Sequence, residues 1–394
     1  MDKERFLDSV RTLGKIGWEE GKGLFRMGFT EAFVKGRDYV AALMRDAGMR
    51  VHVDPVGNLF GRYDGPSPEK KAILMGSHLD SVPGGGIYDG HLGVLSALEA
   101  ARSLHEKGLL HCPVEVVGFN AEEGGEMGGT FGSRAVCGEV SSLPASDVLA
   151  SLNLTPKGIE ASRLDFSRYR AWFELHIEQG PVLWHRKIPI GIPSAIVGIT
   201  RFRISVAGES NHAGTTPMED RKDAMKAAVR LLSCWYDEVE RMQGQNFVCN
   251  IGTFSLEPGS APVVPGRASF VLELRSTEPE RIKVLEQKFR DLLPQAILPV
   301  TMEPMIDKPG TQLDAHLRDM IRETCAEMGI EFLDMLSGAG HDTVPISRKI
   351  PSAMIFVPSI GGISHSMAEE TADDDMVRGD RKSTRLNSSH QPLS

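Results

Sequence analysis

Short apolar runs alternate with amphipathic helical patterns through the first 195 residues, and this alternation restricts the fold more than any other feature of the chain. Ala72–Met75 and Val114–Phe119 have the length and composition of buried strands, and Gly90–Lys107 between them repeats leucine and alanine at helical spacing. Trp172–His176 is expected to be a third strand. Because a helix between two strands allows them to run parallel, the pattern predicts an α/β domain with a mostly parallel sheet.

The middle of the chain follows a different order, strand–helix–strand–strand–helix, which is typical of a small α+β domain. The segments concerned are Gly198–Val206, Glu219–Arg241, Phe247–Ser255, Ala268–Arg275 and Glu280–Leu293. A further strand near Val300 would complete a ferredoxin-like unit. The α/β pattern then resumes with a helix over Leu313–Met328 and a strand over Ser352–Val357.

We therefore expect one α/β domain in two parts, 1–195 and 306–380, with an α+β domain inserted at 196–305. The remaining residues, 381–394, are polar and lack periodicity. They begin where a closing helix is expected, so we predict that this tail is disordered or foreign to the fold.

Charge and composition narrow the classes of function. The net charge of -9 argues against non-specific binding to nucleic acid or to an anionic membrane, because both need a basic surface. The longest apolar stretch, Ile188 to Thr200, contains proline and glycine and is too short to span a bilayer. The start of the chain lacks the apolar core of a secretory signal, and the cysteines are widely spaced without a CxxC pair. We expect a cytoplasmic protein with reduced cysteines.

Candidate metal ligands follow the expected strands. In GSHLDSVPGGGIYDG, His78 ends a strand, Asp80 is placed to orient its imidazole, and Asp89 follows a glycine-rich loop. The alternative for Asp89 is that it only caps the following helix. In FNAEEGGEMGG, the neighbouring carboxylates of Glu122 and Glu123 repel each other unless they share a cation or a proton. A solvated acidic turn is the alternative there.

Two further histidines follow strands. His176 lies near a strand end in ELHIEQGPVLW, where the alternative is a core histidine, and His365 lies in the loop GGISHSMAEE, where the alternative is a surface histidine. Each residue alone is weak evidence, but the carboxyl ends of parallel strands meet at one edge of a sheet. Mixed nitrogen and oxygen ligation suits Zn, Mn, Co or Ni and differs from the thiolate ligation of structural zinc. We expect a catalytic metal site at this edge.

With these motifs in place, the chain resembles the M20-type metallohydrolases from about residue 5 to about residue 379. The shared motifs are GSHLDSVPGGGIYDG, AEEGGEMGGTFGSRA, LHIEQGP, NHAGTTPM with MEDRKDA, GAGHD and SHSMAEE. LHIEQGP, HAGTTPM and GAGHD favour the branch of N-carbamoyl-L-amino-acid hydrolases, β-ureidopropionases and allantoate amidohydrolases.

The resemblance implies two divalent metal ions per subunit, drawn from Zn, Mn, Co or Ni. Asp89 would bridge the two ions. His78 and His176 would complete the coordination of one ion. Glu123 and His365 would complete the coordination of the other.

The same resemblance implies that Glu122 is the general base and that Gln179, His212 and Arg275 contact the substrate. His212 would donate to the oxyanion, and Arg275 would hold a substrate carboxylate. His341, in SGAGHDT, would lie in a substrate loop. As alternatives, the residues after His212 only build the start of a helix, and Arg275 only pairs with a nearby acid.

Three features depart from the family pattern. Glu273 replaces the aspartate of a D-x-R motif, and Pro262 replaces an asparagine that contacts substrate. The closing helix is expected to be missing. The replacement by Pro262 leaves the particular ureido substrate open.

The implied activity is hydrolysis of the linear ureido amide of an N-carbamoyl amino acid or related ureido acid, with release of ammonia, carbon dioxide and the amino acid. The inserted domain would act as a lid and as the dimerisation domain of a homodimer. A dipeptidase or aminoacylase of the same superfamily is the first alternative, because it uses the same ligands. A non-catalytic metal-binding or scaffold protein is the second, although every expected ligand and Glu122 are present.

Overall fold

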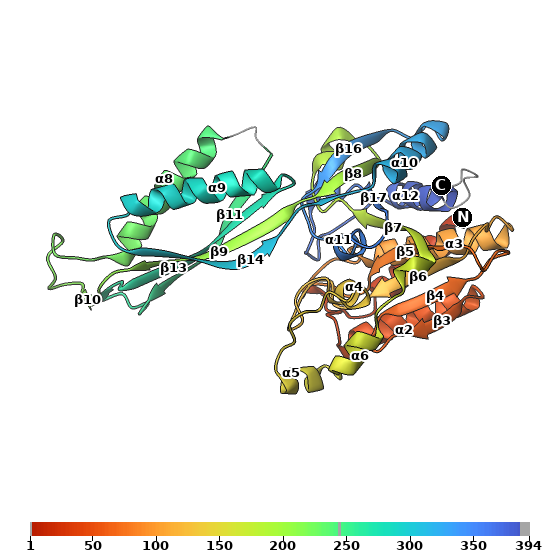
Figure 1. The fold of residues 1–394 in the computed structure, drawn as a ribbon, viewed down its shortest axis with the longest axis horizontal. Helices are drawn as coiled ribbons and strands as arrows, with labels where there is room; N and C mark the ends of the chain where they lie inside the picture. Colours follow the sequence, from red (N-terminus) through yellow and green to blue (C-terminus); the bar gives the residue numbers. More distant parts are fainter. Residues whose placement is uncertain (1, 243–245, 387–394) are drawn as a thin grey trace. The chain divides into compact units, whose positions relative to one another are not determined.

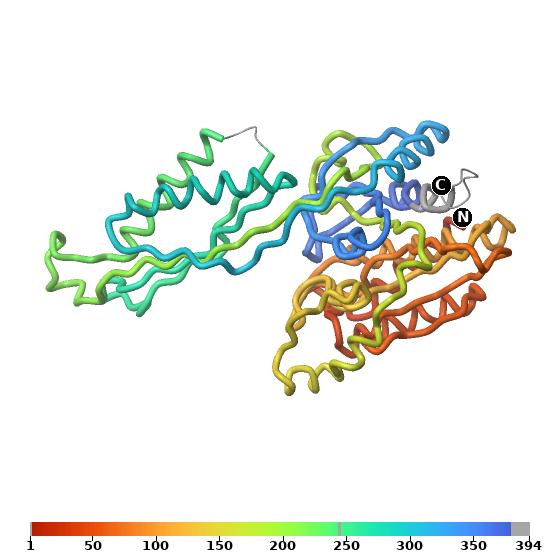
Figure 2. The backbone as a smooth tube through the Cα atoms, viewed as in Figure 1, coloured from red at the N-terminus to blue at the C-terminus, as the bar shows by residue number. Residues whose placement is uncertain are grey.

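The computed structural model describes residues 2–242 and 246–386, which form two units. The first unit comprises the described parts of Met1–Ser194 and Leu313–Ser394, and the second comprises those of Ala195–Gln312. Figure 2 traces the chain as it leaves the first unit, forms the second and returns. Each unit has a hydrophobic core of its own and is described separately.

The first unit is built on a mixed sheet with the strand order β8-β17-β7-β5-β6-β4-β3, and β16 pairs with β8. The short strand β15, which comprises the last two residues before the chain re-enters this unit, also pairs with β8. The strands are β3 (Arg50–Val53), β4 (Leu59–Tyr63), β5 (Ala72–His78), β6 (Val114–Phe119), β7 (Tyr169–Ile177), β8 (Ile190–Ile196), β15 (Thr311–Gln312), β16 (Phe332–Ser337) and β17 (Ser352–Val357). The central strands β6, β5, β7 and β17 are parallel, whereas β8 is antiparallel to β17 and β15 at one side, and β4 is antiparallel to β6 and β3 at the other. The predicted parallel sheet is therefore the centre of a mixed sheet.

Helices cover both faces of this sheet (Figure 1). One layer contains α1 (Lys3–Gly14), α2 (Glu31–Asp46), α3 (His91–Glu106), α10 (Ala315–Glu327) and α12 (Asp373–Leu386), and the other contains α4 (Phe131–Val136) and α11 (Thr343–Ile346). Alternate residues of β5 divide between the layers: Ile73 and Met75 pack into the first, Ala72 and Leu74 into the second. Coverage on both faces explains why β5, β6 and β17 are buried along their whole length.

Shorter elements lie in the connections of the first unit. They are the hairpin of β1 (Trp18–Glu19) and β2 (Gly23–Leu24), and the helices α5 (Ser146–Ser151), α6 (Pro156–Ala161) and α7 (Val182–Arg186).

Helix α12 corrects the prediction for the tail, because residues 381–386 continue this helix. Its first turn holds three aspartates, which suit the positive end of a helix dipole. Met376 and Val377 are buried in the main core, and Asp374 pairs with Lys3 of α1 at 2.9 Å. The closing helix is therefore present. The rest of the predicted tail, 387–394, lies outside the described residues.

The second unit is an antiparallel sheet with the order β11-β13-β9-β14, packed against two helices (Figure 1). Its elements are β9 (Gly198–Ala207), α8 (Ala224–Arg241), β11 (Val248–Glu257), β13 (Arg267–Ser276), α9 (Pro279–Leu292) and β14 (Val300–Lys308). A short second ladder pairs β10 (Asn211–His212) with β12 (Val263–Val264). The order β-α-β-β-α-β with this strand arrangement is the predicted ferredoxin-like fold.

Two boundaries in this region differ from the sequence prediction. The second crossing is expected at 305/306, but β14 runs through these residues and the unit ends at Gln312. The long helix is expected to begin at Glu219, whereas α8 begins at Ala224. The Asp223 side chain caps α8 by accepting from the backbone N–H of Lys226 at 3.1 Å, so the five preceding residues form turns instead.

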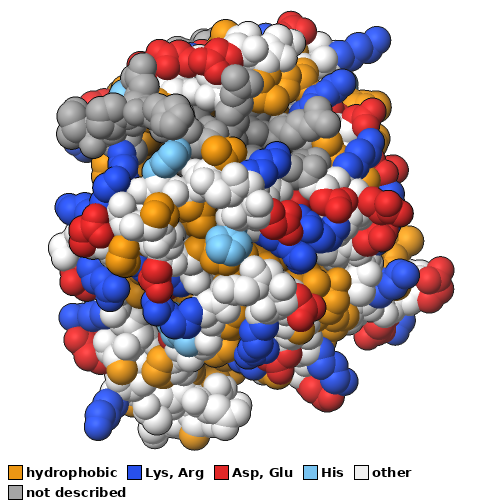
Figure 3. All heavy atoms as spheres, turned by 90° about the vertical axis from the view of Figure 1, so that its right-hand side faces the viewer, with side chains coloured by type: hydrophobic (Ala, Val, Ile, Leu, Met, Phe, Trp, Pro, Cys, Tyr) orange, Lys and Arg blue, Asp and Glu red, His pale blue; other side chains and the backbone are white. Residues whose placement is uncertain are grey.

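Within 2–242 and 246–386, no helix combines the length and apolar character that crossing a membrane requires. On the face drawn in Figure 3, Lys and Arg side chains stand among Asp and Glu side chains. This face therefore does not present an extended field of one sign.

Candidate metal centre

Four parallel strands bring candidate ligands to one edge of the central sheet. His78 is the last residue of β5, and His176 is the last but one of β7. Glu122 and Glu123 follow β6, and His365 lies in the loop after β17. The carboxyl ends of parallel strands are where open α/β sheets hold their sites, so topology and motif agree.

The two carboxylate oxygens of Asp89 face different partners. Oδ1 lies 3.1 Å from His176 Nε2 and 3.4 Å from His78 Nε2. Oδ2 lies 3.3 Å from His365 Nε2, and this nitrogen is 3.5 Å from Glu123 Oε2. His78, Asp89 and His176 form one group of possible ligands, and Asp89, Glu123 and His365 form a second. Within each group, the possible ligand atoms lie within 4.8 Å of one another. Asp89 is therefore shared by two groups of possible metal ligands.

The helix that follows Asp89 does not use it as a cap. The N-cap of α3 is Gly90, and no side chain caps this helix. Gly90 has a φ of 72°, and a Cβ built on it would lie 2.3 Å from Cε1 of His78. The glycine therefore permits the left-handed turn and the close approach of the histidine ring. The capping alternative for Asp89 is wrong.

Asp80 connects the adjacent acids to His78. Its Oδ1 accepts from the backbone N–H of Glu122 at 3.0 Å, and its Oδ2 accepts from that of Glu123 at 3.1 Å. The backbone oxygen of Asp80 lies 3.1 Å from His78 Nδ1. A proton held on Nδ1 by this contact leaves Nε2 as the ligand atom.

The carboxylates of this site influence one another strongly. Burial raises the pKa of Glu122 well above its ordinary value, and the neighbouring Glu123 adds to the shift. Burial and the charge of Asp89 raise the pKa of Glu123 to about 7. Burial acts against ionisation of Asp89 too, but hydrogen bonds from His176 and two other histidines hold its pKa well below the ordinary value. A cation here would relieve the repulsion between the carboxylates.

Unpaired buried atoms also fit a cation. Among the described residues, Glu123 Oε1 and Gln179 Oε1 are buried without a hydrogen-bond partner. Gln179 Nε2 donates to Asp89 Oδ2 at 2.8 Å and lies 3.2 Å from His365 Nε2. Buried polar atoms are normally satisfied, and a nitrogen and oxygen donor set of this kind suits Zn, Mn, Co or Ni. The residues present therefore fit divalent metal ions.

His341 lies behind His176 in the interior. Its ring packs edge-on against that of His176 with centroids 4.5 Å apart, and its Nε2 lies 2.8 Å from Ser337 Oγ. Burial lowers the pKa of His341 well below its ordinary value, and the charge of His176 adds to the effect. His341 is thus held as a neutral ring against a candidate ligand. Its expected contact with substrate stays a prediction.

Sequence reasoning missed Glu174, a buried acid behind the ligands. Its Oε1 accepts from Ser77 Oγ at 2.7 Å, and its Oε2 accepts from the backbone N–H and the Oγ1 of Thr343 at 3.0 and 2.6 Å. The sequence contains a signal for it, because Glu174 is an acid in a mostly apolar strand, two residues before His176 and on the same face.

Left-handed backbone recurs at this site. Ala121, Gln179 and His365 have φ values of 56°, 58° and 54°. Non-glycine residues adopt this conformation at a cost that the surrounding structure must offset, and such strain gathers at functional sites. No local sequence signal marks these three positions.

His212 belongs to the second unit, where it is exposed. Its Nδ1 accepts from the backbone N–H groups of Gly214 and Thr215 at 3.0 and 3.2 Å. A neutral ring held in this way carries its proton on Nε2, which becomes a donor. The loop is tied down by the Pro262 carbonyl, which accepts from the N–H of Ala213 at 2.8 Å. This loop does not start a helix, so the structure contradicts that alternative for His212.

Arg275 also belongs to the second unit and forms the ion pair considered as an alternative. Its Nε donates to Glu273 Oε1 at 2.8 Å, and the other oxygen of Glu273 accepts from Arg201. Burial works against ionisation of Glu273, but these two arginines lower its pKa overall. The glutamate in place of the family aspartate therefore bridges two neighbouring strands.

Several known proteins are similar to this chain along most of its length. The profile of peptidase family M20/M25/M40 matches residues 74–386. The N-carbamoyl-L-amino-acid amidohydrolase of Paenarthrobacter aurescens is 35% identical over 95% of both chains. The allantoate amidohydrolase of Escherichia coli (strain K12) is 31% identical over 94% of both. The crystal structure of an amidase of the hydantoinase/carbamoylase family from Burkholderia phymatum superposes with a TM-score of 0.84, at 32% identity over 98% of this chain and 97% of that one.

Proposed function

We propose that this chain, which belongs to peptidase family M20/M25/M40, hydrolyses the linear ureido amide of an N-carbamoyl amino acid or related ureido acid. Net, one water is consumed, and ammonia, carbon dioxide and the amino acid are released. The observation that carries the proposal is the carboxylate of Asp89 shared between two ligand groups, with Glu122 beside them. The named relatives supply the substrate class.

Two divalent ions would be held in this site. His78 and His176 would bind one ion with Asp89 Oδ1, and Glu123 and His365 would bind the other with Asp89 Oδ2. When bound, such ions lower the pKa of a coordinated water toward neutrality and polarise the amide oxygen. Zn, Mn, Co and Ni all suit this donor set.

Glu122 would move the protons. It stands next to a ligand in the chain but belongs to neither group of ligand atoms, so its carboxylate is available as a base. Glu122 would hold a proton taken from water until the leaving nitrogen accepts it. Hydrogen bonds from the backbone N–H groups of Glu122 and Glu123 to Asp80 fix the turn that carries this carboxylate.

The second unit would serve as lid and dimerisation domain. His212 would donate from Nε2 to the developing oxyanion, supported by the two hydrogen bonds that its Nδ1 accepts. Arg275 would hold the substrate carboxylate, and its Nε donates to Glu273. His212 would act in its own subunit or in the partner of a homodimer.

Ammonia release from a panel of compounds tests the proposal. The panel contains N-carbamoyl amino acids of both configurations, 3-ureidopropionate, allantoate, ureidoglycolate, dipeptides and N-acyl amino acids, each with metal-loaded and chelator-treated protein. We expect turnover of at least one ureido acid by the loaded protein and its loss after chelation. Turnover of peptides or N-acyl amino acids alone would replace the proposal with a dipeptidase or aminoacylase. Absence of any hydrolysis would favour a metal-binding scaffold.

A further inference from the structure

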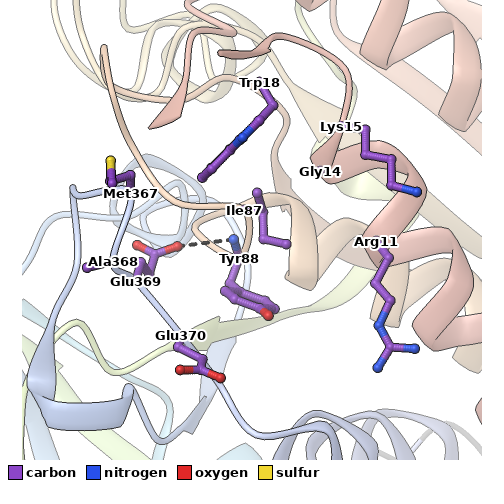
Figure 4. A pocket seen from close by; sticks show the side chains of 10 residues that line it. All are labelled: Arg11, Gly14, Lys15, Trp18, Ile87, Tyr88, Met367, Ala368, Glu369 and Glu370. Atoms are coloured by element: carbon purple, nitrogen blue, oxygen red, sulfur yellow. Dashed lines mark hydrogen bonds between the residues drawn. The ribbon is translucent and has the colours of Figure 1, made fainter. Parts of the chain in front are cut away.

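Glu369 lines a cavity of about 540 Å³ in the first unit, together with Trp18, Tyr88 and Met367 (Figure 4). Its side chain is buried, with 5% of the residue exposed. Figure 4 shows the carboxylate turned toward the backbone nitrogen of Tyr88, the residue before Asp89. The wall of this cavity is therefore continuous with the segment that carries Asp89.

Both oxygens of the Glu369 carboxylate accept hydrogen bonds. Oε1 accepts from the backbone N–H groups of Tyr88 and Asp89 at 3.1 Å each. Oε2 accepts from Ser364 Oγ at 2.8 Å, and Ser364 precedes His365. One side chain thus joins the segment of Asp89 to the segment of His365.

The glycine-rich loop closes directly on Glu369. A Cβ built on Gly86 would lie 2.3 Å from both Cβ and Oε1 of Glu369, so no larger residue fits there. Ser364 Oγ also lies 3.3 Å from Asp89 Oδ2, the oxygen that faces His365. A change at Glu369 would therefore be transmitted to the ligand atoms through the backbone and through Ser364.

We propose that Glu369 is a positioning residue that keeps Asp89 and His365 at the separation at which both can bind one metal ion. It acts through these ligands and touches no reacting atom. The inference rests on the proposed function, because it takes Asp89 and His365 as ligands. Its test measures metal binding, which requires no substrate.

The test compares Glu369→Ala and Glu369→Gln with the control Glu370→Ala. Glu370 is the neighbouring acid, and its side chain is exposed. Each protein is titrated with Co²⁺ against a competing chelator while the visible absorption of the bound ion is recorded. We expect Glu369→Ala to weaken binding of one ion about 10–100-fold and to alter its spectrum, as loss of a partner behind a ligand does. Glu369→Gln should lose less, because an amide oxygen can still accept from both N–H groups.

The cavity provides a second measurement. Truncation to alanine leaves room beside the vacated hydrogen-bond donors, so added formate should restore part of the Co²⁺ affinity of Glu369→Ala. It should leave the wild type and Glu370→Ala unchanged. Kinetics should show a lower kcat for Glu369→Ala with little change in KM.

Wild-type Co²⁺ affinity and spectrum in both Glu369 variants would overturn the inference. So would lower melting of the metal-free variants without any change in metal affinity, because that indicates packing alone. If Glu369→Ala fails to fold, the affinity of Glu369→Gln decides between these outcomes. A wild type that binds metal but hydrolyses no ureido acid would defeat the proposed function and leave the positioning role intact.

Discussion

Asp89, His78 and His176 lie in the buried interior of the first unit, whereas His212 is exposed on a loop of the second. His78, His176 and Asp89 are 2%, 2% and 4% exposed, and three histidines contact Asp89. The ring of His212 is held instead by two backbone N–H groups of its own loop. In the first unit, contacts between side chains fix the position of Asp89. In the second unit, hydrogen bonds from the backbone fix the ring of His212.

We expect the buried site and the exposed histidine to serve two different tasks. Metal ligands need geometry that is set before binding, which strand ends and buried partners provide. A group that meets substrate can be carried by an element that moves, provided that its own tautomer and rotamer are set. Substitutions in the first unit should therefore change metal content or proton transfer, and substitutions in the second should change kinetics at constant metal content.

The largest effect is expected for Glu122→Gln. An amide cannot accept the proton of water, so kcat should fall by about 10²–10⁴ while the metal content stays the same. Glu126→Gln is the matched control, because Glu126 is an exposed acid of the same loop. Steady-state kinetics with metal analysis makes the comparison. Near-normal kcat, or loss of an ion, would remove Glu122 from the role of base.

His212→Ala should follow, with kcat lower by about 10²–10³ and unchanged metal content, because one oxyanion donor is lost. Mixing this variant with Glu122→Gln locates the donor. If His212 acts across the interface of a homodimer, each mixed dimer regains one intact site and activity returns. If it acts within its own subunit, the mixture stays inactive. A loss of metal in His212→Ala would contradict the separation of tasks.

Metal removal should weaken the first unit selectively. With free ion at 100 times its Kd, binding to the folded ligands adds about 2.7 kcal/mol to the free energy of unfolding. The second unit has a separate core without these ligands and should unfold at the same temperature with or without metal. Calorimetry of loaded and chelated protein resolves the two transitions. Equal shifts in the unfolding temperatures of both units would contradict this expected difference between them.

Arg275→Lys should have the smallest effect. Lysine replaces a planar fork by a point charge, so KM should rise about tenfold for substrates with a carboxylate and much less for an amide analogue. Arg203→Lys, an exposed arginine on β9, is the control. Equal increases for both substrates would exclude Arg275 from the carboxylate pocket.

The fold was predicted correctly where the local residue pattern and the order of the elements indicate the same structure. The expected bounds of Val114–Phe119 and Ser352–Val357 equal those of β6 and β17, because strands buried on both faces leave an uninterrupted apolar run. The ferredoxin-like unit was likewise predictable from the order of its elements. The motifs predicted the candidate ligands, and the expected parallel strands predicted that these ligands lie at one edge of the sheet.

The failures involve contacts between distant segments. Nothing local distinguishes Glu369 from Glu370, yet Glu369 bonds to a residue 280 positions away. Helix α12 continues past a polar sequence because buried Met376 and Val377 anchor its start. The start of α8 depended on which of several acids serves as the cap, and Asp223 is the one whose side chain reaches the backbone.

Metal stoichiometry tests the central claim most directly, because the claim is that Asp89 joins two groups of ligands. Protein loaded with Zn²⁺ or Mn²⁺ is passed through a desalting column, and its metal content is measured for the wild type, His176→Ala, His365→Ala and Asp89→Ala. The account predicts two ions per subunit in the wild type, one in each histidine variant, and impaired binding of both in Asp89→Ala. One ion in the wild type, or two tightly bound ions in Asp89→Ala, would contradict it.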